Sequence, residues 1–464
     1  PEMKRSRPKT PKVKKSSANK RSCSRLARNH VPSRSFLSTR DVLAYRLRQN
    51  GLSRLHDHGG VTALSGLGSN VAAVATLLCG VQAQDLKAAL LALWQRLPGG
   101  ACSHDVPARD IDVDVAAPTL TDCMKLISQA KGVVRIWAQR GTLHLFANAD
   151  WPTITAVTAK RREKFQTQSC VSGRYTDGVD CTEEFQEMKQ TLTELLDVGA
   201  DARVTGADLV NSGHDTRLRY PCFSFASYEG IGSRVDVLGE SGRSVIAPRS
   251  FVAPGIDWAP RMADDSEPLA LQQLAKQFFS TYGPAAEQDF RYFFGLAAVV
   301  SKQSVNALVE SGGLTAVDMP ESKDFSSYQH FVSHPIDIPA RNPHQPGDVT
   351  SPSCIRLLGR FDPLLLAHKD KSCWIAPSLK HRIWTNNADV RACVLVEGRI
   401  RGTWRHSKVS TAKQIPISVF VSLFPENGKL SGRQCSALKR QANGFASFMG
   451  SSLHAKVVFD DFWR

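Results

Sequence analysis

Apolar residues recur at helical spacing in many separate stretches of the chain, and most stretches end near a glycine, proline or asparagine. Apolar side chains three and four residues apart share one face of a helix, so this spacing predicts amphipathic helices. The predicted helices cover residues 41–52, 69–80, 86–97, 120–130, 183–197, 206–212, 268–283, 287–296, 301–312 and 431–449.

Other stretches alternate apolar and polar residues, which is typical of half-buried strands. They cover residues 132–139, 141–146, 314–319, 391–406, 416–424 and 453–462, the fourth holding two strands about Glu397-Gly398. Helices followed by a hairpin or a strand make a winged-helix signature, which occurs at 120–146 and again at 268–319. Beyond residue 352 the chain is β-rich, which predicts a small barrel or an α+β module.

One short segment interrupts this pattern with polar side chains. Gly80 ends one predicted helix and Asp85 can cap the next, which leaves Val81 to Gln84 as an extended joint. Residues two apart in an extended chain point the same way, so Gln82 and Gln84 should present two amides side by side.

Charge is unevenly distributed along the 464 residues. The net charge is +16, and residues 1–40 hold 13 Lys and Arg but one acidic residue, Glu2. Such a segment has too few apolar groups to fold, so we expect residues 1–36 to form a disordered basic tail. The tail could bind phosphate or act as a nuclear signal, and its Ser- and Arg-rich composition also fits a mitochondrial transit peptide. We expect a nuclear protein, with the mitochondrion as the alternative.

The 11 cysteines form no CxxC pair, which indicates reduced thiols rather than a disulfide framework or a zinc cluster. His56 and His58 could both face a metal, but no third ligand is apparent. We therefore expect no metal and no cofactor. No long uncharged apolar run predicts a membrane span.

Taken together, five segments resemble winged-helix DNA glycosylases of the AlkZ and YcaQ type, and their order along the chain is more specific than any one of them. The segments are "GVQAQD" at 80–85, "RIWAQRGTLHL" at 135–145, "YGPAAEQDFRYFFGL" at 282–296, "GRFDPLLLAHKDK" at 359–371 and "LVEGRIRGTW" at 395–404. The fourth departs from the usual pattern at Pro363, where an acid is usual, and at His368, where an aromatic residue is usual.

The resemblance implies an α+β fold with three tandem winged-helix units in a C-shaped arrangement and a C-terminal β-barrel. On this basis the expected organisation is a tail (1–36), three units (37–150, 151–265 and 266–325), a linker (326–352) and a barrel module (353–464). It also implies hydrolytic excision of alkylated purines from double-stranded DNA, including bulky N7-guanine adducts and interstrand crosslinks. Gln82 and Gln84 match the family's catalytic motif of Gln, an apolar residue, then Gln or Asp.

Two amides suit only a restricted chemistry. Most glycoside hydrolysis uses carboxylates as acid and base, and an amide does not titrate in this range. A glutamine can still hold water and direct its carbonyl dipole at a positive charge. That is sufficient when the leaving group is good, and a guanine alkylated at N7 is cationic and departs neutral. Asp85 could supply a base, but we interpret it as a helix cap.

Several other residues are candidate DNA contacts. Arg140, Thr142 and His144 lie at the wing of the first unit and could reach phosphate or the minor groove. Arg399, Arg401 and Arg405 are expected on one strand face, where they could follow a DNA backbone. The charge run "KRREK" at 160–164 fits a solvated face better than a DNA contact. We expect a monomeric glycosylase; the alternative is a non-enzymatic winged-helix DNA-binding or regulatory protein.

Overall fold

The computed structural model describes residues 38–52, 67–97, 100, 118–128, 132–198, 202–235, 250–252, 266–325, 327–333, 354–407 and 415–462. All of them fall within one unit of contacts, Ser35–Arg464. The predicted tail, the pair His56 and His58 and most of the predicted linker lie outside the described residues. None of the described helices is long and apolar enough to cross a membrane.

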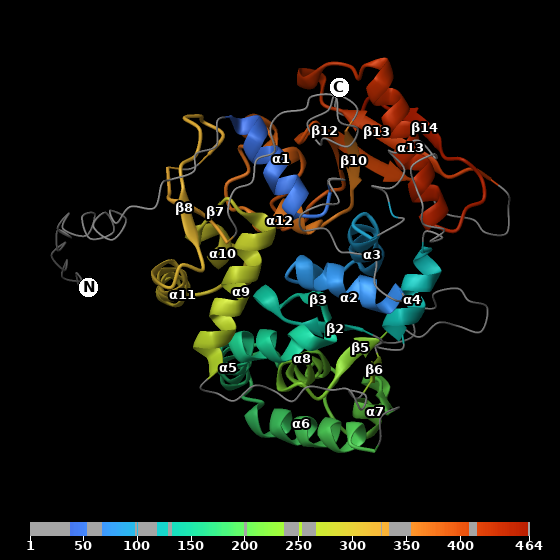
Figure 1. Ribbon diagram of the computed structural model, residues 1–464. Coiled ribbons are helices and arrows are strands. Elements are labelled where there is room, and N and C mark those ends of the chain that lie inside the picture. Colours follow the sequence, from blue (N-terminus) through green and yellow to red (C-terminus); the bar gives the residue numbers. More distant parts are fainter. Residues whose placement is uncertain are drawn as a thin grey trace, which may run out of the picture. The chain divides into compact units, whose positions relative to one another are not determined.

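One order of elements occurs three times along the chain: helix, short strand, two helices, then two strands. Each time, the last strand lies between the other two and pairs antiparallel with both. Figure 1 shows β2 beside β3 and β5 beside β6. The first set is α2 (Leu67–Leu77), β1 (Val81–Gln82), α3 (Leu86–Trp94), α4 (Leu120–Ser128), β2 (Val133–Trp137) and β3 (Leu143–Ala147). The second is α6 (Thr182–Leu196), β4 (Arg203–Val204), α7 (Gly206–Asn211), α8 (Arg219–Glu229), β5 (Ser233–Val235) and β6 (Ser250–Val252). The third is α9 (Glu267–Tyr282), β7 (Ala285–Ala286), α10 (Glu287–Phe294), α11 (Ala298–Glu310), β8 (Thr315–Val317) and β9 (His330–Val332).

The amphipathic pattern predicted most of these helices, together with α1 (Thr39–Gln49), but missed α5 (Trp151–Val171) and α8. The first half of α5 is buried on nearly all sides and its second half is mostly exposed, so no single apolar stripe runs along it. β9 lies in the range predicted as a linker. The pattern missed it because a strand of three residues is too short to show alternation.

The C-terminal module is an open five-stranded sheet with the order β10-β11-β12-β13-β14. Its strands are β10 (Ile355–Leu358), β11 (Cys393–Val396), β12 (Arg399–His406), β13 (Ser418–Leu423) and β14 (Lys456–Phe459). Among the described residues the edge strands β10 and β14 do not pair, so the expected closed barrel is wrong. The predicted turn is confirmed, because Glu397 and Gly398 have the positive φ values of 52° and 80° that a two-residue hairpin uses.

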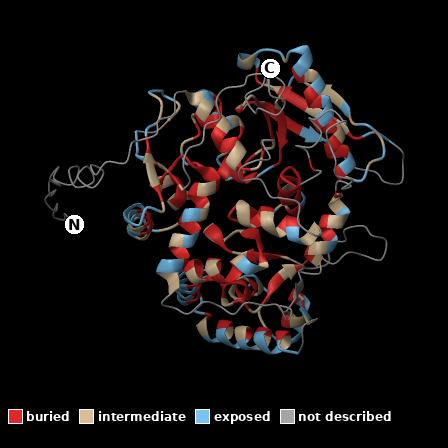
Figure 2. Cartoon of the chain, in the orientation of Figure 1, coloured by how far each residue is buried: buried red, intermediate tan, exposed pale blue. Residues whose placement is uncertain are grey.

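One apolar core joins the first repeat to this sheet. Residues of α2, α3 and α4 pack in the same cluster as β10 to β13 and α13 (Gly432–Phe448). Figure 2 shows buried residues in β10 to β13, in contrast to the exposed outer side of α6. The segment 81–84, which carries the two glutamines, contributes Val81 and Ala83 to this core and is therefore anchored in a core shared with the C-terminal module.

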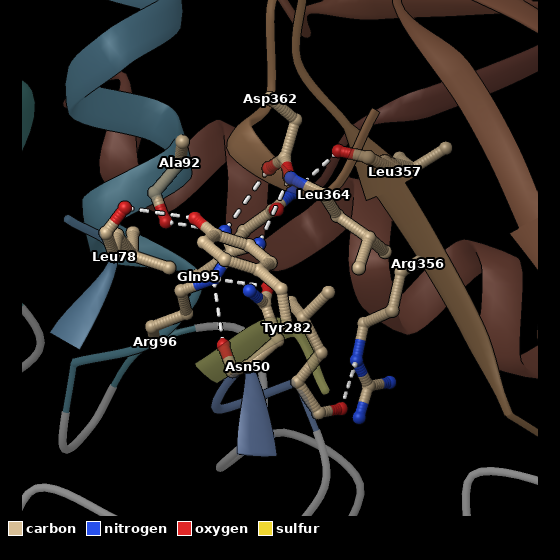
Figure 3. A network of polar contacts seen from close by, with 11 residues as sticks. Asn50, Leu78, Ala92, Gln95, Arg96, Tyr282, Arg356, Leu357, Asp362 and Leu364 are labelled. Atoms are coloured by element: carbon tan, nitrogen blue, oxygen red, sulfur yellow. Dashed lines mark hydrogen bonds and ion pairs between the residues drawn. The ribbon is translucent and has the colours of Figure 1, made fainter. Parts of the chain in front are cut away.

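A buried ion pair ties the same two regions together (Figure 3). Arg96, just after α3, contacts Asp362 at 2.9 Å, and both side chains are fully buried. Asp362 also accepts a hydrogen bond from the Leu364 amide at 3.0 Å, capping α12 (Pro363–Ala367). A buried charge needs such partners, so this pair fixes the segment 359–371 against α3.

Candidate active site

The joint that carries the two glutamines is extended, as predicted. Gly80 has φ +85°, and a Cβ there would collide with the Phe146 ring. Val81 and Gln82 form β1, which pairs with β3, and the Ala83 amide donates to the Leu143 carbonyl at 2.7 Å. The guanidinium of Arg135 donates to the Ala83 carbonyl at 3.0 and 2.6 Å. The backbone of the joint is thus held by its pairing with β3 and by the side chain of Arg135.

The two amides point the same way and contact each other. Gln82 Nε2 donates to Gln84 Oε1 at 2.9 Å, and Arg140 Nη2 donates to Gln82 Oε1 at 3.3 Å. An arginine can only donate, so this contact assigns the oxygen of Gln82 to the Arg140 side and its NH₂ group to Gln84. Gln82 is 8% exposed, whereas Gln84 is exposed. The pair therefore presents Gln84 to solvent and uses Gln82 to orient it.

Arg140 reaches Gln82 from the turn between β2 and β3. Its backbone is left-handed, with φ 54°, a conformation uncommon for a residue other than glycine. The guanidinium lies over the Tyr292 ring, 5.8 Å from the centroid. Burial lowers the pKa of Arg140, while Tyr292 opposes this effect. Thr142, in the same turn, donates to the Gln139 carbonyl at 3.2 Å.

His144 lies inside the protein rather than on a wing surface. It pairs with Gln82 across β1 and β3, and it is 1% exposed. Its Nδ1 donates to the Thr142 carbonyl at 2.9 Å. Burial, with a smaller contribution from the Arg140 charge, lowers its pKa to about 3, so the ring is neutral. Its predicted contact with DNA stays a prediction, made for a side chain that the structure buries.

The arginines of β12 do not share one face. The pairing of β11 with β12 skips Arg401, which is an extra residue on β12. Such a bulge shifts every later side chain to the other face, so Arg399 and Arg405 lie on opposite faces and the prediction is wrong. Arg399 pairs with Asp324 at 2.6 Å, and Arg401 donates to the Asn427 carbonyl. Their roles in DNA binding stay predictions.

Asp85 is a helix cap, as interpreted from the sequence. Its side chain accepts a hydrogen bond from the Ala88 amide at 3.1 Å at the start of α3. Arg360 also approaches Asp85, with Nη1 3.7 Å from the carboxylate, and pairs with Asp389 at 2.7 Å. The segment 359–371 therefore borders the glutamine pair at Arg360.

The same segment brings a buried lysine close to Tyr292. Lys371 Nζ lies 5.3 Å from the centroid of the Tyr292 ring and donates to the carbonyls of Leu365, at 2.7 Å, and His368. Burial lowers the pKa of Lys371 to about 7, although Asp289 opposes this shift. Tyr292 thus lies close to two cations, Lys371 and Arg140.

The sequence did not single out Tyr292, Arg360 or Lys371. All three lie in segments that carry the family resemblance. The resemblance therefore pointed to these segments, but it did not point to the individual residues. The described residues contain no group of three His, Cys, Asp or Glu that could hold a metal ion.

Comparisons with known proteins identify the family of the chain. A family model described as DNA glycosylase AlkZ-like matches residues 75–448. A solved structure, the Streptomyces sahachiroi DNA glycosylase AlkZ, superposes with a TM-score of 0.66 at 20% sequence identity, covering 91% of this chain and 99% of that one. The comparison with curated proteins gave no match.

The extent of the family match defines the class of the protein: it is a hydrolase of N-glycosyl bonds in DNA. The chain belongs to the AlkZ-like DNA glycosylase family, and its fold is the mixed α+β fold of that family.

Proposed function

We propose that this protein excises purines alkylated at N7 of guanine from double-stranded DNA, with water positioned by Gln84 and Gln84 oriented by Gln82. The observation that carries the proposal is the chain of hydrogen bonds from Arg140 to Gln82 to Gln84. Bulky adducts and interstrand crosslinks belong to the same proposed substrate class, because they share the cationic N7-alkylguanine leaving group.

The arrangement of the amides supports this chemistry. Gln84 Oε1 accepts one hydrogen bond from Gln82 and keeps a second lone pair for a water molecule. The same oxygen dipole faces positive charge favourably as the sugar becomes oxocarbenium-like. Neither amide needs to gain or lose a proton, since the cationic guanine leaves as a neutral base.

We also infer that the three repeated sets of elements are winged-helix units that together bind the duplex, in a protein that acts as a monomer. The order helix, strand, two helices and a hairpin supports this inference, because it is the order of a winged helix. The curved arrangement of the units around DNA belongs to the same proposal, as does a nuclear address in the basic tail. Family membership favours the enzyme over a non-enzymatic regulator.

The test is incubation of the full chain with a duplex that carries a single 7-methylguanine, followed by alkaline cleavage of abasic sites. We expect strand cleavage at the lesion with the wild-type chain and none at an unmodified guanine. The Gln84→Ala variant is tested beside the wild-type chain, and it should release the damaged base far more slowly. Binding of a preferred duplex sequence without any base release would reject the proposal and favour a regulator.

A further inference from the structure

Three arginines from two different elements lie close together, and one of them, Arg140, contacts Gln82 of the glutamine pair. Arg140 comes from the turn between β2 and β3, and Arg161 and Arg162 come from α5. A Cβ at Gly295 would lie 2.9 Å from Cγ of Arg140 and 3.3 Å from Nη2 of Arg161. The absence of a side chain at Gly295 therefore lets these two arginines approach the same point.

Arg162 joins the group at a second glycine. A Cβ at Gly141 would collide with the Arg162 guanidinium, which also donates to the Ala138 carbonyl at 3.4 Å. Burial and, secondarily, the charge of Arg161 lower the pKa of Arg162 to about 10. The two arginines of α5 therefore repel each other, and the Arg162 charge also reaches His144.

These positive charges have no negative partner among the residues that the structure describes. In the part of the chain that the structure describes, no ion pair joins a carboxylate to Arg140, Arg161 or Arg162. Half-buried like charges are unfavourable unless an anion binds between them. The exposed side chain among the three is Arg161, so an anion has access from its side.

We propose that Arg140, Arg161 and Arg162 form a binding site for one phosphodiester group of the DNA backbone, next to the nucleotide that is hydrolysed. The inference rests on the proposed function. Guanidinium groups bind phosphate through paired, charge-assisted hydrogen bonds. A bound phosphate also neutralises cations that would otherwise oppose the positive charge developing on the sugar near Gln84.

The first experiment measures the salt dependence of binding to an undamaged duplex, which requires no catalysis. The variant is Arg161→Gln, and its matched control is Lys164→Gln, which removes an exposed positive charge from the same helix. The logarithm of the binding constant falls as the logarithm of the salt concentration rises. This slope should become shallower by about 1 in Arg161→Gln, as expected for one lost phosphate contact. Lys164→Gln should keep the wild-type slope, and Arg161→Lys, which retains the charge, should largely restore it.

The second experiment locates the phosphate. Single methylphosphonate linkages are placed along the damaged strand of a 7-methylguanine duplex. One neutral linkage near the lesion should slow base release by the wild-type chain. The same linkage should not slow base release by the Arg161→Gln variant any further.

Equal slopes for Arg161→Gln, Lys164→Gln and the wild-type chain would overturn the phosphate site. The same conclusion follows if no methylphosphonate position distinguishes the Arg161→Gln variant from the wild-type chain. A slope that depends on Arg161, in a chain that releases no base, would instead support the phosphate site and reject the proposed substrate.

Discussion

The side-chain amide of Gln82 donates to that of Gln84 across 2.9 Å, so the two glutamines act as a connected pair. In the proposed mechanism Gln82 acts through Gln84. We therefore expect Gln84→Ala and Gln82→Ala each to reduce the single-turnover rate by about 100-fold or more, the size of effect seen when one preorganised polar group is removed. The double variant should be little slower than Gln84→Ala alone, because residues that act as a unit are not additive. The measurement is base release from a 7-methylguanine duplex under single-turnover conditions.

An exposed glutamine on α6, Gln190, provides the control. Gln190→Ala should retain the wild-type rate. Losses that multiply in the Gln82→Ala and Gln84→Ala double variant would show that the two amides act independently, contrary to the prediction.

Local sequence signals predicted the arrangement of the two glutamines correctly. Gly80 follows the end of α2 and Asp85 caps α3, so the joint between them was expected to be extended, with residues two apart pointing the same way. The same parity argument failed for Arg399 and Arg405. It assumed a regular strand, and the extra residue Arg401 is visible only in the pairing with β11.

Contacts between distant segments could not be predicted from one sequence. Tyr292 and Lys371 meet near Arg140 through the packing of three elements, and nothing in their local sequence encodes that distance. The open edge of the C-terminal sheet is similar: alternation predicted β11 to β14 but missed β10, and it could not tell whether β10 and β14 would pair. The helix α5 was missed because its buried residues follow no single stripe.

The buried pair of Arg96 and Asp362 should be important for stability. Asp362→Ala leaves the Arg96 charge buried without its partner, which we expect to lower the free energy of unfolding by about 3–5 kcal/mol. The double variant Arg96→Met, Asp362→Leu should be less destabilised than Asp362→Ala, because it buries no charge. Urea denaturation of the full chain measures both effects.

An exposed ion pair serves as the comparison. Asp177 pairs with Arg217 at 2.9 Å at the surface, and Asp177→Ala should change the free energy of unfolding by less than about 1 kcal/mol. If Asp362→Ala behaved like Asp177→Ala, the buried pair would not stabilise the link between α3 and the segment 359–371.

The buried lysine should make stability rise with pH. The pKa of Lys371 is lowered from 10.5 to about 7, so between these values the unfolded chain holds a proton that the folded chain has lost. In this range the free energy of unfolding therefore increases by up to about 1.4 kcal/mol per pH unit. Below the pKa of the folded state Lys371 is charged in both states, and the folded chain bears the full cost of burying that charge. The free energy of unfolding should therefore rise more steeply from about pH 7 to pH 10 in the wild-type chain than in Lys371→Met.

Lys164→Met, which removes an exposed lysine, should leave the wild-type pH dependence unchanged. Equal pH slopes for Lys371→Met and the wild-type chain would mean that Lys371 keeps its proton in the folded protein throughout this range.

The carboxylate of Asp85 can be assigned as a cap or as a catalytic base by a single substitution. A serine at position 85 can accept the hydrogen bond from the Ala88 amide, but it cannot act as a base of comparable strength. We therefore expect Asp85→Ser to keep the rate of base release within a few-fold of wild type. Asp85→Ala, which removes the cap, should lower the free energy of unfolding by about 1 kcal/mol. Thermal unfolding and single-turnover base release on the same samples separate the two roles. A fall of 100-fold or more in the rate of Asp85→Ser, with unchanged stability, would assign general-base catalysis to Asp85 and leave the glutamines with an orienting role.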